Sequence, residues 1–259
     1  MRRLHLLEIE DQPWCPAPIR DAGTDFLQFA LRLGNNYGPV VPRLREALRR
    51  TGARRVVDLC SGGGGPWPRL VRDLDREEPR VEVVLTDRYP NLEALRRVRD
   101  ESGGRLGFHP EPVDALRIPP ELDGFRTLFT GFHHFRPEDA RAILADAVRS
   151  RQGIAVFEAT ERTALSLAAT ALSPLMVLLA TPFIRPFRWS RLLWTYLVPV
   201  VPPFVLFDGL VSCLRTYTPA ELRELVAPFA GDGYTWEIGE ERGAGPVPVT
   251  YLIGCPSAD

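Results

Sequence analysis

The chain contains a run of four glycines directly after a short apolar segment, Val-Val-Asp-Leu-Cys-Ser-Gly-Gly-Gly-Gly at 56–65. Glycines let the backbone approach a ligand closely, and a helix that starts after such a turn offers free N–H donors. Segment 67–74 has the pattern of that helix. The run therefore predicts a site for an anionic or zwitterionic ligand. Its candidate contacts are Cys60, Ser61, Gly62, Gly63 and Gly64.

Two well-known nucleotide sites do not fit this loop. A nicotinamide site of the G-x-G-x-x-G type needs a third glycine where this chain has Trp67. A P-loop needs a lysine, and all 32 basic residues of this chain are arginines. A carboxylate beside the turn, Asp58, instead suits a cofactor that carries an ammonium group, such as the methionine end of S-adenosylmethionine.

Two further acids follow the next two β-like segments. Asp87, with Arg88 beside it, comes after segment 81–86, where a carboxylate can accept both hydroxyls of a ribose. Asp114, followed by Ala115, comes after segment 106–112 and would be within reach of an adenine amino group. Three acids in chain order thus match three parts of one adenosyl ligand.

Alternating strands and helices must position these residues. Such alternation predicts βαβ units and therefore a parallel sheet. Strands are expected at 55–60, 81–86, 106–112, 126–131 and 153–158, and helices at 24–33, 41–50, 67–74, 91–100 and 137–151. A helix start at Thr218-Pro219 and two more β-like runs, 234–238 and 247–253, close the chain.

The stretch from about Arg54 to Ala159, with the C-terminal pair of strands, resembles the class I S-adenosylmethionine-dependent methyltransferase family. The resemblance implies an α/β fold: a seven-stranded, mostly parallel Rossmann-like sheet with an antiparallel C-terminal strand. It also implies S-adenosyl-L-methionine as cofactor and S-adenosyl-L-homocysteine as product. By the resemblance, Asp58, Gly62 and Gly64 line the methionine end, Asp87 holds the ribose, Asp114 and Ala115 the adenine edge, and the backbone at Thr130 and Gly131 the amino group. Cys60 departs from the pattern, because the family usually has a glycine there.

Candidates for chemistry follow the fourth and fifth strands, where ligands of open α/β sheets bind. His133 and His134 could remove a proton from an acceptor oxygen, nitrogen or carbon, because the pKa of histidine is near neutral. Glu158 is a second candidate. Structural use remains open for all three, as helix cap, packing or arginine partner. Methyl transfer does not strictly require a base, because the sulfonium is already an activated donor.

An apolar insertion follows the fifth strand. Segments 163–184 and 192–207 carry no charge, and segment 185–191 between them is basic and aromatic. Because the insertion leaves the carboxyl end of a strand, it must lie over the catalytic face. It could be a soluble lid, a peripheral membrane contact through 163–207, or a transmembrane hairpin, and the prolines within it count against the last.

Six residues of the insertion and of the N-terminal region are expected to face the acceptor. They are Trp14, Tyr37, Arg188, Tyr196, Asp208 and Arg215. The apolar character of the insertion predicts a small lipophilic acceptor, such as a quinone, polyketide, isoprenoid or lipid-like compound.

Length and composition fit one α/β domain: 259 residues, 45% apolar and 25% charged. Its expected parts are N-terminal cap helices (1–52), a cofactor-binding core (53–160), the lid insertion (161–217) and a C-terminal helix with a strand pair (218–259). A net charge of −1 without a basic arm disfavours nucleic acid as a partner. The oligomeric state is left open.

Four scattered cysteines, Cys15, Cys60, Cys213 and Cys255, predict neither a metal site nor a disulfide framework. Together with an N-terminus that does not read as a signal peptide, they favour the cytoplasm, with membrane association as an addition. The sequence thus predicts a methyltransferase enzyme. The alternative is a non-catalytic cofactor-binding module that docks a membrane or protein through the insertion.

Overall fold

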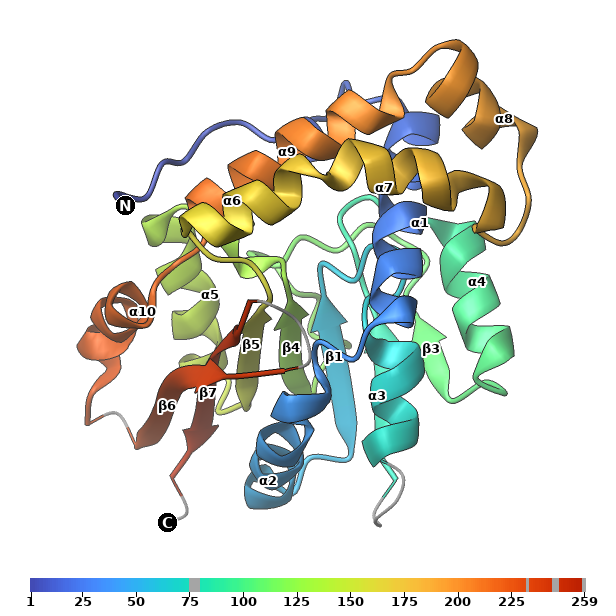
Figure 1. The fold of residues 1–259 in the computed structure, drawn as a ribbon. Helices are drawn as coiled ribbons and strands as arrows, with labels where there is room; N and C mark the ends of the chain where they lie inside the picture. The colour runs from blue at the N-terminus through green and yellow to red at the C-terminus, as the bar shows by residue number, and fades with distance from the viewer. Residues whose placement is uncertain (75–79, 232, 244–246, 258–259) are drawn as a thin grey trace.

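A seven-stranded sheet in the order β3-β2-β1-β4-β5-β7-β6 forms the centre of the structure, a computed structural model that describes residues 1–74, 80–231, 233–243 and 247–257 (Figure 1). The strands are β1 (Arg55–Leu59), β2 (Glu82–Leu85), β3 (Leu106–Phe108), β4 (Phe125–Phe129), β5 (Ile154–Glu158), β6 (Tyr234–Glu241) and β7 (Val249–Pro256). Strands β1 to β5 pair in parallel, and β7 runs antiparallel to both β5 and β6. This arrangement confirms the predicted fold class.

Helices cover both faces of the sheet because successive side chains of a buried strand point to opposite sides. Val56 packs in a cluster with residues of the helices on one face, and its neighbour Val57 packs with those on the other. The first face carries α2 (Val41–Thr51), α3 (Trp67–Leu74) and α4 (Leu92–Glu101), and the second carries α5 (Pro137–Arg149) and α10 (Pro219–Val226). Helical turns lie at η1 (Gly38–Val40), η2 (Phe132–His134) and η5 (Ala227–Phe229).

Most predicted elements are present with shifted ends, and the shifts have local causes. Strands β1 and β4 stop before Cys60 and Thr130 because both residues have left-handed backbones, with φ of 58° and 46°. Strand β3 is shorter than predicted, since Pro110 and Pro112 have no N–H for a ladder. Helix α1 (Ala17–Leu33) begins well before residue 24, with a proline in its first turn.

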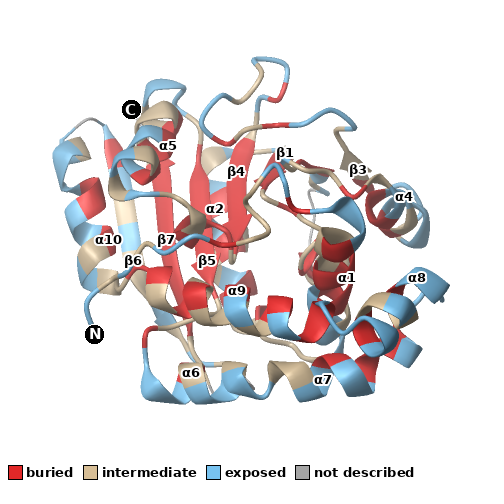
Figure 2. Cartoon of the chain, turned by 90° about the horizontal axis from the view of Figure 1, so that it is seen from above, coloured by how far each residue is buried: buried red, intermediate tan, exposed pale blue. Residues whose placement is uncertain are grey.

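The insertion forms a helical layer across the carboxyl ends of the parallel strands (Figure 1). Its elements are α6 (Ala164–Ala171), α7 (Ser173–Ala180), η3 (Thr181–Phe183), α8 (Trp189–Leu192), η4 (Leu193–Leu197) and α9 (Val201–Arg215). Helix α9 contacts α1, α6 and α7, and Phe26, Val177 and Phe204 share a third apolar cluster there. Burial is concentrated in the sheet and along α9, whereas α6 and much of α7 are exposed (Figure 2).

Candidate active site

A cavity of about 810 Å³ lies along the carboxyl ends of the strands. Its wall combines the loops that follow β1, β2, β3 and β4 with α1 and the N-terminal segment 5–13. Most of the predicted cofactor residues line it: Cys60, Ser61, Gly62, Gly63, Asp87, Arg88, Asp114, Ala115 and Thr130. Residues far apart in the chain therefore meet at one site, and two of the three predicted acids, Asp87 and Asp114, belong to it.

The glycine loop takes a path that most side chains would oppose. Gly62, Gly64 and Gly65 have positive φ values of 52°, 104° and 50°. A Cβ on Gly64 would also lie 3.0 Å from Cγ2 of Val98. Gly64 is buried against this side chain and does not line the cavity. Cys60 also has a left-handed backbone, with φ of 58°. Glycine adopts this conformation without strain, so the backbone at position 60 favours glycine over cysteine.

Asp58 lies beneath the loop and does not reach the cavity surface. It is 1% exposed, and its two carboxylate oxygens accept hydrogen bonds of 2.6 Å from Oγ of Ser61 and from Oγ1 of Thr127. Burial raises its pKa to about 6. Asp58 therefore does not line the cavity, contrary to its predicted place at the ligand; it fixes Ser61, which does line it.

Asp87 and Asp114 lie on the cavity wall, each held by backbone donors. The N–H groups of Gly62 and Tyr89 donate to the two oxygens of Asp87 at 2.7 and 2.8 Å. Oδ1 of Asp114 accepts from the N–H of Leu116 at 2.9 Å. A carboxylate oxygen can accept more than one hydrogen bond, so both acids keep acceptor capacity toward a ligand. Asp87 also joins the loop after β1 to the loop after β2.

The cavity continues past the end of β4 to Tyr37 and Thr130, whose hydroxyls hydrogen-bond to each other. Oγ1 of Thr130 also accepts from the N–H of Ala159, after β5, at 3.1 Å. Gly131 is turned away from the cavity lining, and a Cβ there would lie 3.0 Å from Cβ of Cys60. The loops after β1 and β4 are therefore in close contact at this point.

His133 and Glu158 form a buried pair behind the cavity. Nδ1 of His133 lies 2.8 Å from Oε2 of Glu158, and both side chains are about 1% exposed. The other carboxylate oxygen of Glu158 accepts from the N–H of Phe132 at 2.7 Å. Burial opposes ionisation of Glu158, yet His133 and these donors hold its pKa below the usual value. Their placement indicates that these two residues orient the turn and do not meet an acceptor directly.

His134 is the histidine that lines the cavity. Its Nδ1 lies 2.7 Å from Oε2 of Glu8 and 2.9 Å from Oδ1 of Asp11. Burial alone would lower the pKa of His134, but these two carboxylates raise it well above its ordinary value. The two carboxylates therefore favour the protonated ring, which donates hydrogen bonds.

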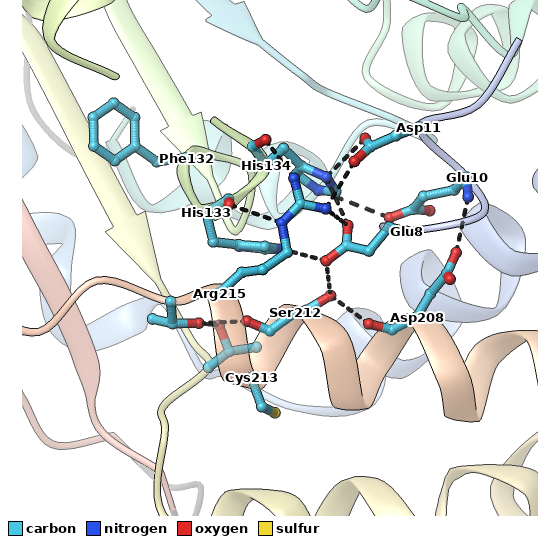
Figure 3. Close-up of polar contacts among 12 residues, drawn as sticks. Glu8, Glu10, Asp11, Phe132, His133, His134, Asp208, Ser212, Cys213 and Arg215 are labelled. Carbon is cyan, nitrogen blue, oxygen red and sulfur yellow. Dashed lines mark hydrogen bonds and ion pairs between the residues drawn. The ribbon is translucent and has the colours of Figure 1, made fainter. Parts of the chain in front are cut away.

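Acidic residues of the N-terminal segment were missed by the sequence analysis, which considered this segment only as a possible leader. Glu8, Glu10 and Asp11 line the cavity. Asp208 of α9 fixes the segment, because its two oxygens accept from the N–H groups of Ile9 and Glu10 at 2.8 and 2.9 Å (Figure 3). The acidic run 8–11 is the sequence signal that could have suggested a role.

Arg215, the last residue of α9, joins this cluster to the turn after β4 (Figure 3). It lies 2.9 Å from Asp11 and 3.2 Å from Glu8, and it donates to the carbonyls of His133 and His134. Arg215 also lines the cavity, as predicted. Donor atoms of Glu8, His133 and His134 lie within 4.8 Å of one another, so this set could hold a metal ion, although Arg215 already places a positive charge there.

The structure places Trp14, Arg188, Tyr196 and Asp208 outside the cavity lining, contrary to the prediction that they face the acceptor. Trp14 is 63% exposed. The guanidinium of Arg188 lies 2.6 Å from Glu93 and 3.7 Å from buried Asp25. Tyr196 donates to the carbonyl of Leu178. No residue from 163 to 207 belongs to the described lining of the cavity.

No protein-family model matches the chain, and no curated protein matches its sequence. Among solved structures, the mitomycin 7-O-methyltransferase MmcR is 17% identical over 84% of this chain and 53% of its own, with a TM-score of 0.49. The pyocyanin biosynthetic protein PhzM is 18% identical over 86% of this chain and 55% of its own, also with a TM-score of 0.49.

A third similar structure is magnesium protoporphyrin IX methyltransferase (ChlM) from Synechocystis PCC 6803, with bound SAH. It is 14% identical over 90% of this chain and 88% of its own, with a TM-score of 0.49. The chain spans about half the length of MmcR and PhzM.

Proposed function

We propose that the chain is an S-adenosylmethionine-dependent methyltransferase that acts on a small, lipophilic acceptor. One observation supports this above all: the glycine loop after β1, Asp87 after β2, Asp114 after β3 and Thr130 after β4 border a single cavity at the carboxyl ends of a parallel sheet. Ligands of open α/β sheets bind at that edge.

The residues present fit the cofactor. The left-handed loop brings backbone atoms of Ser61, Gly62 and Gly63 to the cavity without side chains in the way. Asp87 would hold the ribose hydroxyls, Asp114 and Ala115 the adenine edge, and the backbone at Thr130 the amino group. When bound, the cofactor supplies an activated methyl group on a sulfonium. Because this donor is already activated, positioning the acceptor against it would supply much of the rate.

His134 would orient the acceptor by donating a hydrogen bond to its nucleophilic atom or to a neighbouring oxygen. The ring is held by Glu8 and Asp11 and faces the cavity. Because these carboxylates keep it protonated, it suits an acceptor that is already an anion or one that loses its proton to water. His133 and Glu158 would support this role by fixing the turn that carries His134.

Four exposed leucines in the cavity wall support a lipophilic acceptor. The insertion does not support it, because none of residues 163–207 belongs to the described lining. Leu6, Leu7, Leu27 and Leu116 line the cavity and are also exposed to solvent. An apolar molecule that enters past them would cover surface that is otherwise in contact with water. We further propose a cytoplasmic protein that works at a membrane surface, where such molecules accumulate.

Two measurements test this function. Calorimetry with S-adenosylmethionine and S-adenosylhomocysteine should show binding to the wild-type chain, and a tritiated methyl group should transfer to members of a panel of quinones, phenols, isoprenoids and lipids. A parallel panel of polar metabolites should remain unlabelled. Binding without transfer to any compound would favour the non-catalytic module, and absence of cofactor binding would refute the proposal.

A further inference from the structure

Helices α6 and α7 expose apolar side chains and bury polar ones, the reverse of the usual pattern of surface helices in soluble proteins. Their polar side chains point inward: Oγ of Ser166 and Oγ1 of Thr170 each lie 3.4 Å from Sγ of Cys213 on α9. Thr181, at the start of η3 just after α7, is also buried, and its hydroxyl donates to the carbonyl of Val177 at 2.7 Å. A surface helix in water normally buries its apolar stripe and exposes polar residues.

The outward side of these helices is instead formed by large apolar side chains. We call this surface the apolar face, and its residues are Leu165, Leu172, Leu175, Met176, Leu179 and Phe183. Leu172, Leu179 and Phe183 are each at least 60% exposed. Exposed apolar surface of this kind is uncommon on soluble monomers and marks an interaction site for a membrane or a protein.

The stretch that carries the apolar face is long, apolar and little buried. Residues Ala164–Phe183 form the one described single helical stretch long and apolar enough to cross a membrane, with a mean hydropathy of 1.8 and only 22% of its window buried. Twenty helical residues are roughly 30 Å long, so a face of this length can cover a wide area of a membrane surface. A core helix of a soluble protein can be equally long and apolar, but it is mostly buried, whereas this stretch is mostly exposed.

The middle of the insertion, around α8, carries the residue types found at the boundary between lipid and water. Trp189 is 78% exposed and packs edge-on against Phe187, with ring centroids 5.1 Å apart. Tyr196 and Arg185 are also exposed in this part. Aromatic side chains with a polar tip and arginines favour the level of the headgroups, where the arginine meets phosphate.

Ion pairs with the body of the protein fix the insertion in place. Buried Asp25 of α1 accepts the guanidinium of Arg191 and lies within 3.7 Å of that of Arg188. The inner side of α7, with Val177 and Ala180, is packed in the cluster shared with α1 and α9. A crossing of the membrane would have to break these contacts, whereas lying on its surface leaves them intact.

We propose that the apolar face docks on an anionic phospholipid bilayer, with α6 and α7 lying in the interface and Trp189 and Arg185 at the headgroups. The catalytic cavity then stays with the docked protein at the membrane surface, without insertion of the sheet. This proposal concerns binding to lipid and does not depend on methyl transfer.

Co-sedimentation of the full chain with vesicles tests the proposal. The wild-type chain should bind vesicles of phosphatidylcholine with phosphatidylglycerol, and it should bind pure phosphatidylcholine more weakly. The double variant Leu175→Glu/Leu179→Glu should lose at least roughly tenfold in partitioning. Leu33→Glu is the matched control, because Leu33 at the end of α1 is 69% exposed but lies outside the apolar face. It should bind as the wild type does.

Thermal unfolding of each variant establishes that it folds. As a second readout, brominated lipids should quench tryptophan fluorescence of the wild type, and Trp189→Phe should remove most of that quenching. A wild-type chain that stays in the supernatant with both vesicle types would overturn the proposal, as would equal losses in Leu33→Glu. A dimer in light scattering that the double variant dissociates, without vesicle binding, would assign the face to a second copy of the chain.

Discussion

Asp208 is the residue on which the position of the N-terminal segment most depends. Its two carboxylate oxygens accept from the consecutive N–H groups of Ile9 and Glu10, at 2.8 and 2.9 Å. The segment so fixed contributes Glu8, Glu10 and Asp11 to the cavity wall. Replacing Asp208 by alanine should therefore release this segment locally and leave the sheet intact.

The magnitude follows from the two hydrogen bonds. Each bond to an ionised group contributes roughly 1.5–3 kcal/mol. The low end applies here, because burial raises the pKa of Asp208 to about 6 and the charge is only partly compensated. Asp208→Ala should then lower the local opening free energy by about 3 kcal/mol, a change of roughly 100-fold in the opening equilibrium. Asp208→Asn, which keeps one acceptor, should cost about half of that.

Amide hydrogen exchange measures this opening directly. The amides of Ile9 and Glu10 should exchange roughly 100-fold faster in Asp208→Ala, whereas amides of β1 and β4 should keep their protection. Asp100→Asn, on the exposed side of α4, serves as the control and should change neither. Unchanged exchange at Ile9 and Glu10 in Asp208→Ala would refute the reasoning.

Three further predictions concern the cavity and its loops. Asp87→Asn should weaken S-adenosylmethionine binding roughly tenfold or more in calorimetry, because a charged acceptor near the ligand is lost. The control Asp123→Asn, at an exposed position, should bind as the wild type does. Equal affinities of Asp87→Asn and the wild type would argue against the ribose assignment. Cys60→Gly should stabilise the chain by up to about 1 kcal/mol in urea unfolding by relieving the left-handed strain, whereas Cys60→Val should destabilise it; the opposite order would contradict the backbone explanation. Since the pKa of His134 is raised in the folded chain, its stabilising contribution is complete below the unfolded value of 6.5 and is lost as pH rises through the folded pKa. The free energy of unfolding should therefore fall more steeply above neutral pH in the wild type than in His134→Gln, and parallel profiles would show that the ring is not held as an imidazolium.

The succession of strands and helices along the chain and the glycine loop could be predicted because their signals are local. Asn91 caps α4 as its residue type suggests, with its side chain accepting from the N–H of Ala94. Asp87 and Asp114 follow short apolar runs whose ends must meet at one edge of a parallel sheet. Neighbouring residues thus determine these features, and one sequence is enough to find them.

The part of the cavity formed by the turn after β4 and the N-terminal segment could not be predicted, because its contacts join residues that are distant in the chain. His133 is buried against Glu158 and His134 is not, although the two histidines are adjacent in sequence. The side chain of Asp208 accepts from the backbone N–H groups of residues 9 and 10, and no sequence pattern predicts this contact. The insertion was correctly expected to be apolar, but composition alone does not say whether leucines such as Leu175 point to a cavity or to the outside.

The contact between Cys60 and Gly131 has a consequence for how related sequences can vary. A β-carbon at position 131 would lie 3.0 Å from that of Cys60. Position 131 is thus restricted by its neighbour across the two loops. Homologues with glycine at position 60 should tolerate alanine or serine at 131, so the two positions should covary during evolution.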